Sequence, residues 1–252
     1  MFKRLDNLQG KVAVITGGKG QVGLATAQRL AHAGARIVLI NRTEPGPEVL
    51  ASLPNQELNH LSIVADVTAS DTLTAAAEQV KNSCGRCDIL VNSAGITRSV
   101  PPANLDQLTD EMFDEIVTVN LRGVFATIRS FAPLLKASGD GLIVNISSTS
   151  GQCASPSNVA YGSAKAGIDL MTKTLGKALA PAIRVVAVVP GFMEFATSGV
   201  IKPAGANEKM ALGAPLARIG SGDDIACTVE ALATHIRFAT GSIILVDGGR
   251  TI

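Results

Sequence analysis

Short apolar segments alternate with helical segments along the whole chain, and no other feature of the sequence restricts the fold as strongly. Seven segments have the length and the Val, Ile and Leu content of buried strands: Val12–Thr16, Ile37–Ile40, Leu61–Ala65, Ile89–Asn92, Leu142–Ser147, Val185–Val189 and Ile243–Val246. The candidate helices between them are Gln21–Ala33, Thr72–Asn82, Thr109–Lys136, Val159–Leu179 and Asp223–Thr234. Unbroken apolar strands are typical of a parallel sheet covered on both faces. The alternation therefore predicts an α/β fold with a Rossmann-type, doubly wound parallel sheet of about seven strands.

One domain accommodates the whole chain. No repeat, linker or low-complexity tract interrupts the alternation over residues 1–252, and single α/β domains of this length are common. The least regular stretch, residues 192–214, follows the sixth strand. We interpret it as a mobile substrate lid over the binding edge of the sheet, with a passive loop as the alternative.

Composition excludes several classes of partner. The chain carries 22 basic and 21 acidic residues without blocks of like charge, which argues against nucleic acid or an anionic membrane surface as a partner. The apolar runs are far shorter than the ~20 residues of a spanning helix, and the first residues lack the apolar stretch of a secretory signal. We expect a cytoplasmic protein with small-molecule partners. Three histidines and no spaced Cys/His cluster predict no metal site.

Cys84 and Cys87 have the spacing of a dithiol redox motif. A thioredoxin-type pair lies where a strand leads into a helix, whereas these residues follow a predicted helix and precede a strand. We therefore interpret both as small core residues.

A glycine-rich segment lies between the first strand and the first helix. Its candidate cofactor-binding residues are Gly17, Lys19, Gly20, Gln21, Val22 and Gly23. Glycines permit a tight turn and close approach of backbone amides to a pyrophosphate, whose charge the helix N-terminus stabilises. The segment predicts a dinucleotide site. A nucleotide triphosphatase is excluded because Lys19 is followed by Gly20 and not by the Ser or Thr that would bind magnesium.

The end of the second strand predicts which dinucleotide binds. Asn41 and Arg42 stand where an NAD site would place Asp or Glu for the adenosine ribose. An arginine can instead pair with the 2′-phosphate of NADP. We predict NADP(H) rather than NAD(H), with Arg42 as its reader and Lys19 in support; an exposed charge at a strand end is the alternative for Arg42.

Two further strand ends supply candidate cofactor contacts. Asp66, followed by Val67, can accept a hydrogen bond from the adenine amino group, with capping of the next helix as the alternative. Asn92, Ala94 and Gly95 combine one amide with small residues, as expected where the backbone passes under a ribose. An ordinary strand-end turn is the alternative there.

Tyr161 and Lys165 form the candidate catalytic pair at the start of a predicted helix. Four residues make about one turn, so both side chains point the same way. A nearby ammonium favours the ionised phenol, which predicts a proton donor or acceptor close to neutral pH. Ser148, 13 residues before Tyr161, ends the fifth strand and would bring a hydroxyl to the phenol. An exposed helical pair is the alternative, but the three residues together favour carbonyl or alcohol chemistry.

In this order the segments resemble the short-chain dehydrogenase/reductase family over essentially the whole chain. Further matching segments are Val119–Phe125, Val189–Gly191 and Ala239–Gly249. The resemblance implies that Tyr161 exchanges a proton with the substrate oxygen and that Ser148 hydrogen-bonds this oxygen. It also implies that Lys165 holds the nicotinamide ribose and biases Tyr161 electrostatically.

The same resemblance assigns two further sites. Asn120 would be a catalytic residue that supports a proton-relaying water, a role that its position in a helix does not indicate by itself. Pro190 and Gly191 would line the nicotinamide.

Two positions depart from the family pattern. Gln21 stands where the family usually has Gly, at a spot where positive φ or close approach to the phosphate is expected, and Gly20 would compensate in part. Phe195 stands where Thr is common, with Thr197 two residues further on. We expect both changes to alter cofactor affinity without abolishing binding.

The substrate is expected to be a ketone or a secondary alcohol. Residues 92–98 and 164–168 are similar to segments of 3-oxoacyl-[acyl-carrier-protein] reductases, which implies that an acyl carrier-linked ketone is one option. Arg98, Arg122 and Arg129 are candidate contacts for such a carrier, with solvated charges as the alternative. The resemblance also implies a homo-oligomer, either a tetramer or a dimer.

Two other functions stay open on the sequence alone. A redox-sensing protein that binds the dinucleotide without turnover would be expected to lack the proton-transfer residues, which this chain keeps. An NAD-dependent dehydrogenase, epimerase or dehydratase is disfavoured by Arg42 and by the lack of room for a separate substrate domain.

Overall fold

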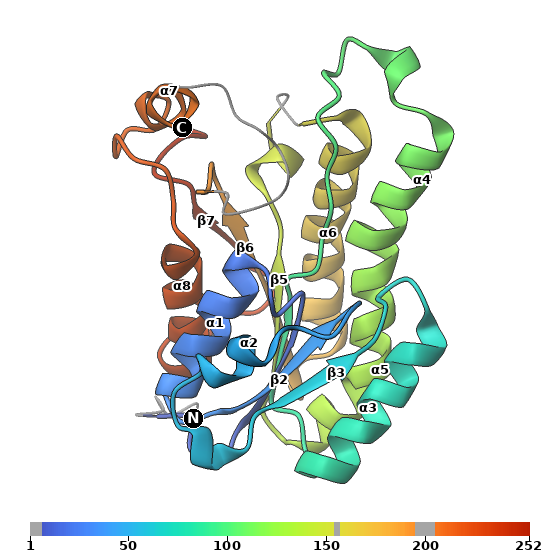
Figure 1. The fold of residues 1–252 in the computed structure, drawn as a ribbon, viewed down its shortest axis with the longest axis vertical. Helices are drawn as coiled ribbons and strands as arrows, with labels where there is room; N and C mark the ends of the chain where they lie inside the picture. The colour runs from blue at the N-terminus through green and yellow to red at the C-terminus, as the bar shows by residue number, and fades with distance from the viewer. Residues whose placement is uncertain (1–6, 154–156, 195–204) are drawn as a thin grey trace.

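The computed structural model describes residues 7–153, 157–194 and 205–252. Its centre is a parallel sheet with the strand order β3-β2-β1-β4-β5-β6-β7 (Figure 1). The strands are β1 (Val12–Thr16), β2 (Arg36–Asn41), β3 (Leu61–Val64), β4 (Ile89–Asn92), β5 (Gly141–Ile146), β6 (Ile183–Pro190) and β7 (Ile243–Val246). Because the chain winds outward in both directions from β1, the sheet is doubly wound, as predicted. The observed strand bounds differ from the predicted ones by at most two residues.

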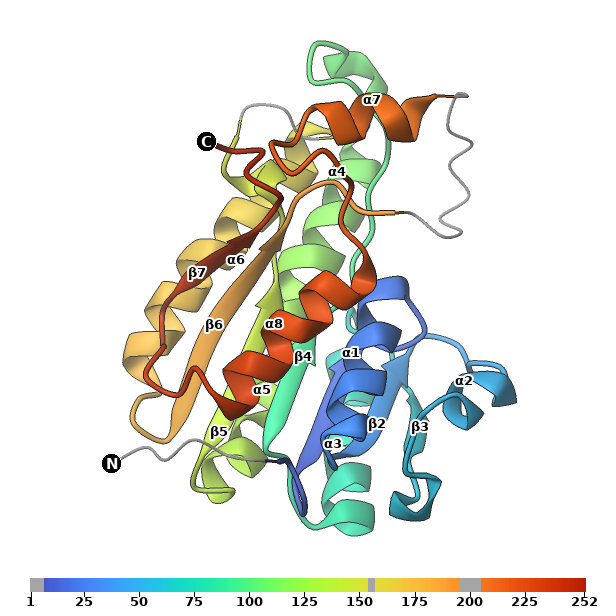
Figure 2. The ribbon, with the colours of Figure 1, turned by 90° about the vertical axis from the view of Figure 1, so that its left-hand side faces the viewer.

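Helices cover both faces of the sheet. They are α1 (Gln21–His32), α2 (Pro47–Ala51), α3 (Ser70–Cys84), α4 (Asp110–Val117), α5 (Gly123–Ala137), α6 (Val159–Ala178), α7 (Ala206–Leu212) and α8 (Gly222–Thr234). Helices α1 and α8 lie side by side on one face, and α3, α5 and α6 lie on the other (Figure 2). None of the helices in the described ranges combines the length and the apolar character needed to cross a membrane.

The side chains of each central strand point alternately to the two helical layers. In β1, Ala13 and Ile15 pack in the cluster that includes α1 and α8, whereas Val12 and Val14 pack against α3 and the opposite layer. Burial of one large aliphatic side chain contributes about 1.5–3 kcal/mol to folding. This two-sided burial explains why the strands read as unbroken apolar runs and have no polar face.

The helix predicted over 109–136 is interrupted. Helix α4 ends at Val117, a π-helical turn spans Thr118–Arg122, and α5 begins at Gly123. A π turn contains one residue more than an α turn and is frequent at functional sites. The turn contains Asn120, which the resemblance had singled out.

The loop predicted at 192–214 contains the short helix α7. Of the residues expected to matter here, Phe195 and Thr197 lie outside the described residues. Neither α7 nor α2 was predicted, because each is too short for a helical period to be recognised in the sequence.

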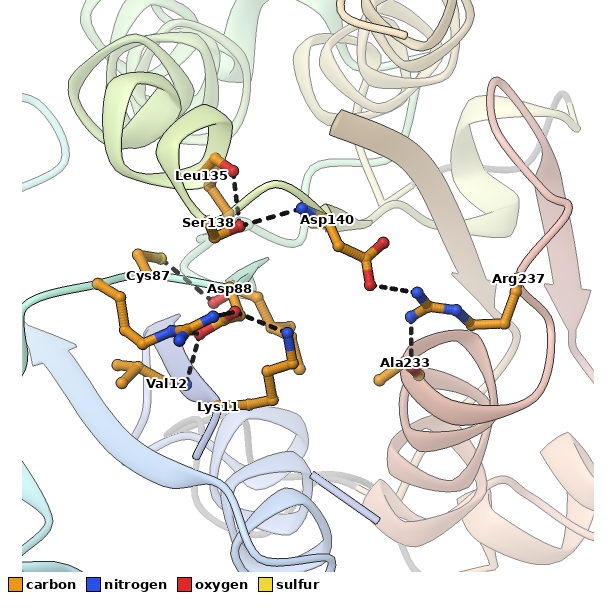
Figure 3. A network of polar contacts seen from close by, with 11 residues as sticks. Lys11, Val12, Cys87, Asp88, Leu135, Ser138, Asp140, Ala233 and Arg237 are labelled. Atoms are coloured by element: carbon orange, nitrogen blue, oxygen red, sulfur yellow. Dashed lines mark hydrogen bonds and ion pairs between the residues drawn. The ribbon is translucent and has the colours of Figure 1, made fainter. Parts of the chain in front are cut away.

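Ion pairs hold the edge of the sheet where the strands begin (Figure 3). The carboxylate of Asp88, just before β4, accepts hydrogen bonds from Lys11 Nζ at 3.0 Å, Val12 N at 3.0 Å and Arg86 Nε at 2.7 Å. Asp140, just before β5, accepts a hydrogen bond from Arg237, which follows α8. These contacts tie together segments that are far apart in sequence.

Cys84 is the last residue of α3 and Cys87 lies between α3 and β4, and both are free thiols. Burial raises the pKa of both thiols, and Cys87 packs inside the core. A raised pKa disfavours the thiolate that disulfide exchange needs, so the structure supports their interpretation as core residues. Among the residues that the structure describes, no three His, Cys, Asp or Glu side chains gather as a metal site would require.

Candidate active site

The candidate residues meet where the parallel strands end. Asn92 ends β4 and lies opposite Asn145 of β5, and Ser148 is the second residue after β5. Pro190 ends β6, whose Val188 lies opposite Ile146. Ligands bind outside the carboxyl ends of the strands in doubly wound sheets, so the predicted residues lie at the expected edge.

Asn158 fixes the start of the helix that carries Tyr161. Its Oδ1 accepts a hydrogen bond from the backbone N–H of Tyr161 at 2.7 Å. Its Nδ2 donates to the carbonyl oxygen of Arg98 at 2.8 Å, in the loop after β4. One buried amide therefore caps α6 and ties it to the neighbouring loop. Asn158 was not predicted from the sequence, although an Asn immediately before a helical segment is an N-cap signal.

The phenol of Tyr161 lies beside the Ser148 hydroxyl. Burial raises the pKa of Tyr161, and a hydrogen bond with Ser148 lowers it by less. The predicted titration of Tyr161 close to neutral pH is therefore wrong for this structure, because the effect of burial on its pKa dominates. At neutral pH the phenol carries its proton and can donate it.

Lys165 is buried under the Tyr161 ring. Its Nζ lies 5.6 Å from the ring centroid and donates a hydrogen bond to the carbonyl oxygen of Ile146 at 2.9 Å. Burial lowers the pKa of Lys165 to about 8, against the opposing effect of Asp169 one turn further along α6. The ammonium is thus held in place by backbone and is close to losing its proton.

The turn that carries Ser148 is docked on α6. Ser147 Oγ donates to the carbonyl oxygen of Lys165 at 3.3 Å. Gln152 Nε2 donates to Asp169 Oδ2 at 3.2 Å. These contacts fix the strand end that carries Ser148 relative to Tyr161. Gln152 and Asp169 had no signal in the sequence, because their contact depends on how the turn packs.

The π turn directs Asn120 toward the loop after β4. Its Nδ2 donates to the carbonyl oxygens of Ile116 at 2.9 Å and Ile96 at 2.8 Å, and its Oδ1 accepts from Ile96 N at 3.3 Å. A Cβ at Gly95 would lie 2.7 Å from Asn120 Oδ1 and 3.9 Å from Lys165 Nζ. The absence of a side chain at Gly95 lets the loop pass between the two residues.

The glycine-rich turn leaves the N-terminus of α1 open. Gly20 is the N-cap residue and makes no side-chain cap, so the first amides of α1 are free for an anion. Gly17 has φ +66°, and a Cβ there would lie 2.8 Å from the Cα of Ala94. Val22 packs against the core, and Gly23 is buried in the first turn. The turn therefore has the shape of a phosphate cradle.

Gln21 adopts ordinary helical backbone, so the expectation of positive φ at this position is wrong. Positive φ falls at Gly17 instead. The Cγ and carbonyl oxygen of Gln21 lie beside Gly222 at the start of α8. The departure from glycine therefore imposes no backbone strain.

The end of β2 carries hydrogen-bond donors that have no partner in the protein. Asn41 Oδ1 accepts from Lys19 N at 3.0 Å, but the buried Asn41 Nδ2 has no partner. Lys19 Nζ donates to Thr43 Oγ1 at 2.6 Å. Arg42 is exposed and, within the described part of the chain, makes no hydrogen bond or ion pair. An orphaned donor beside two cations fits a phosphate group.

The remaining predicted contacts are also at this edge. Asp66 Oδ1 accepts from Thr68 N and Thr68 Oγ1, both at 2.8 Å, and the N-cap of α3 is Ala69, so Asp66 does not cap this helix. Half-buried Val67 lies against Gly123 at the start of α5.

Asn92 and the β6 turn lie further along the same edge. Asn92 Nδ2 donates to Asn145 Oδ1 at 2.8 Å, while its buried Oδ1 has no partner. Ala94 N donates to Thr16 Oγ1 at 3.3 Å, and Gly191 N donates to Val246 O at 3.2 Å.

Comparisons with known proteins agree with this geometry. Residues 19–251 match the family model described as Enoyl-(Acyl carrier protein) reductase. The chain is 36% identical over 251 residues to the 3-oxoacyl-[acyl-carrier-protein] reductase FabG of Thermotoga maritima, covering 97% of this chain and 99% of that protein. It is 33% identical to the FabG of Staphylococcus aureus strain Mu50, with 95% and 97% covered. The crystal structure of gox2181 superposes with a TM-score of 0.88 at 32% identity, covering 98% and 97% of the two chains.

Proposed function

Because the chain belongs to the short-chain dehydrogenase/reductase family, a family of oxidoreductases, we propose that it interconverts a ketone and a secondary alcohol with NADP(H). The observation that carries the proposal is the meeting of three groups from two segments: the Ser148 hydroxyl, the Tyr161 phenol and the Lys165 ammonium. A protonated phenol beside a hydroxyl suits proton donation to a carbonyl oxygen.

Tyr161 is the general acid in this proposal. Its raised pKa keeps the proton on the phenol at neutral pH, which favours the direction of carbonyl reduction. Ser148 donates a hydrogen bond to the same substrate oxygen. As the phenol loses its proton, the ammonium of Lys165 stabilises the phenolate across the 5.6 Å to the ring centroid. In the oxidation direction the same groups act in reverse.

Asn120 has a supporting role. Both hydrogens of its amide are used by backbone carbonyl oxygens, so its side chain holds the loop after β4 in place. We propose that a water held by this arrangement restores the proton of Tyr161, as the family resemblance implies.

The cofactor fits the edge of the sheet where the strands end. A bound dinucleotide supplies or accepts the hydride. The open amides at the start of α1 would hold its pyrophosphate, and Lys19, Asn41 and Arg42 would bind the 2′-phosphate that distinguishes NADP from NAD.

Other chain segments would hold the rest of the cofactor. We assign Asp66 and Val67 to the adenine, Asn92, Ala94 and Gly95 to the riboses, Tyr161 and Lys165 to the nicotinamide ribose, and Pro190 and Gly191 to the nicotinamide. The spare acceptors on Asp66 and Asn92 support this assignment.

Two relatives are named as 3-oxoacyl-[acyl-carrier-protein] reductases. We therefore place 3-oxoacyl thioesters at the head of the substrate panel, with simple ketones and secondary alcohols behind them. The assay follows NADPH oxidation with ketones and NADP reduction with alcohols, each repeated with NADH or NAD.

The Tyr161→Phe variant tests the proposed acid. It removes one hydroxyl and keeps the ring under which Lys165 is packed, so we expect turnover to fall by about 10²- to 10⁴-fold. Fluorescence titration with NADPH serves as the control, because binding should change little. Equal turnover by the wild type and the variant would exclude Tyr161 as the acid. The absence of any nicotinamide absorbance change with every substrate would favour a non-catalytic dinucleotide-binding protein.

A further inference from the structure

The side chains of two arginines in the described part of the chain make no hydrogen bond or ion pair, and these are Arg42 and Arg250. The other described arginines all donate hydrogen bonds to carboxylates, carbonyl oxygens or hydroxyls, and these are Arg29, Arg36, Arg86, Arg98, Arg122, Arg129, Arg184, Arg218 and Arg237. Arg98, Arg122 and Arg129, the predicted carrier contacts, are therefore already engaged. The proposed function assigns Arg42 to the 2′-phosphate of the cofactor, but it assigns no role to Arg250.

Arg250 lies in a tight turn after β7. The carboxylate nearest to it in sequence, Asp247, accepts from Gly249 N at 2.9 Å and from Thr251 N and Oγ1 at 2.9 and 2.7 Å. These bonds hold the turn and leave the carboxylate turned toward the backbone. The turn is therefore ordered, and its acid is not the partner of Arg250.

The guanidinium of Arg250 is stacked on Phe192. Its central carbon lies 3.4 Å from the centroid of the phenyl ring. Stacking covers one face of the guanidinium, while the N–H groups along its edge still point outward in the plane. An arginine held in this way is oriented without using any of its donors.

The stack lies at the same edge of the sheet as the catalytic groups. Phe192 directly follows Pro190 and Gly191, the residues assigned to the nicotinamide, and β6 lies next to β5, which ends before Ser148. The view in Figure 2 shows β6 and β7 side by side, with the C-terminal end beyond their carboxyl ends. Arg42 follows β2, on the other side of β1 and β4. Arg42 and Arg250 therefore lie on opposite sides of the central strands β1 and β4, at the edge of the sheet where the strands end.

One further segment, residues 213–221 between α7 and α8, holds the stack in place. Leu216, after α7, donates its N–H to the carbonyl oxygen of Gly248 at 3.1 Å. Gly220 donates its N–H to the carbonyl oxygen of Phe192 at 2.8 Å. Three segments of the chain thus converge on the pair and fix its position.

We propose that Arg250 binds an anionic group of the substrate, a carboxylate or a phosphate located away from the reacting carbonyl. The inference rests on the proposed function, because it assigns a substrate class to the same site. Guanidinium pairs with both oxyanions through two parallel hydrogen bonds, and the stacked geometry presents the N–H edge that such pairing needs. The expected preference for a charged over a neutral substrate is about 10- to 100-fold in kcat/KM.

Two matched pairs of ketones test the proposal. Levulinate and methyl levulinate differ in one carboxylate, and acetoacetyl-4′-phosphopantetheine and acetoacetyl-pantetheine differ in one phosphate. The Arg250→Met variant keeps a long side chain to cover Phe192 but has no donors. We expect it to lose about 10- to 100-fold in kcat/KM with an anionic substrate and to change little with its neutral partner.

Two further variants complete the experiment. Arg250→Lys keeps the charge without the planar fork and should retain part of the preference. Lys81→Met removes one positive charge from the exposed side of α3 and should leave both members of each pair unaffected. A response confined to the phosphate pair would identify a carrier arm as the source of the anion, and a response confined to the carboxylate pair would identify a small keto acid.

Several outcomes separate the inference from the proposed function. The wild type could reduce neutral and anionic ketones alike, or Arg250→Met could affect both equally. Either result would overturn anion binding by Arg250 and would leave the proposed ketone reduction intact. If the wild type reduces no ketone, the reductase proposal fails. Calorimetric titration of the wild type and of Arg250→Met with levulinate and with 4′-phosphopantetheine then tests anion binding directly. Equal affinities of the wild type and Arg250→Met for both probes would overturn it.

Discussion

The two edges of the central sheet use polar groups in opposite ways. At the edge where the strands begin, the buried carboxylate of Asp88 accepts four hydrogen bonds, from Lys11, Val12 and both ends of the Arg86 fork (Figure 3). Burial alone would raise the pKa of Asp88, yet these donors lower it. The charge is fully compensated within the protein.

The opposite edge holds polar groups that have no hydrogen-bond partner. Asn41 Nδ2 and Asn92 Oδ1 are buried without a partner, and the side chains of Arg42 and Arg250 make no hydrogen bond within the described part of the chain. The unpartnered Nε atoms of Arg184 and Arg237 near the first edge differ, because the terminal nitrogens of both groups already donate. Unsatisfied groups cost stability unless a ligand completes them. The contrast indicates that one edge supports the fold and the other is shaped for ligands.

The Asp88→Asn variant tests this difference between the two edges with the largest expected effect, which is a loss of stability. Removing the charge leaves two cations beside a neutral amide in a buried site, and we expect a loss of about 3 kcal/mol in the free energy of unfolding. Urea denaturation measures it, and the affinity of the folded variant for NADPH should be unchanged.

The matched control for that measurement is Asp223→Asn. Asp223 pairs with Arg29 at 2.5 Å, but its side chain is 63% exposed. Solvent screening limits the expected loss to below about 1 kcal/mol. Similar losses in both variants would show that the Asp88 cluster is no more important than a surface pair.

A smaller effect is expected at the other edge, from Arg42→Ala. The variant removes a charged donor that contacts nothing in the protein, so stability should not change. Affinity for NADPH should fall by about 10- to 100-fold, because the 2′-phosphate loses a charged hydrogen bond. Affinity for NADH, measured on the same variant, should stay constant. Tighter binding of NADH than NADPH by the wild type would overturn the assignment of the cofactor.

The smallest expected effect is on the pH dependence of activity. The pKa of Lys165 is lowered to about 8, so the ammonium loses its proton above this pH while the phenol of Tyr161 keeps its own. We expect kcat/KM for ketone reduction to fall as pH rises through about 8, with the slope of one proton. A profile that is flat from pH 7 to 10 would contradict a role for the ammonium.

Asp169→Asn provides the companion measurement. The amide can still accept from Gln152, but the negative charge that raises the pKa of Lys165 is gone. The fall in kcat/KM should therefore begin at a lower pH than in the wild type. A merely structural role of Asp169 would lower activity without moving the profile.

The strands and the catalytic segment could be predicted from the sequence because their signals are local. Continuous apolar runs such as Val12–Thr16 require burial on both faces, and this fixes a parallel sheet. The positions of Ser148, Tyr161 and Lys165 then follow from strand ends and from one helical turn. Asn120 could be found only through resemblance, because the π turn that directs it has no recognisable pattern.

Contacts between distant segments could not be predicted. Arg250 stacks on Phe192, 58 residues earlier in the chain, and neither residue has a distinctive local context. The pKa of Tyr161 was predicted in the wrong direction, because the sequence shows a neighbouring lysine but not how deeply the phenol is buried. Spacing indicates which groups meet, whereas burial decides how they titrate.

The π-helical turn at Thr118–Arg122 also restricts how this gene can vary in length. Deletion of one codon there would restore a uniform α-helical pitch and remove the wide turn that directs Asn120. The hydrogen bonds between the Asn120 amide and Ile96 would then be lost, although α4 and α5 would keep their buried faces. This segment can exchange side chains over evolutionary time, but it cannot lose a residue without releasing the loop after β4.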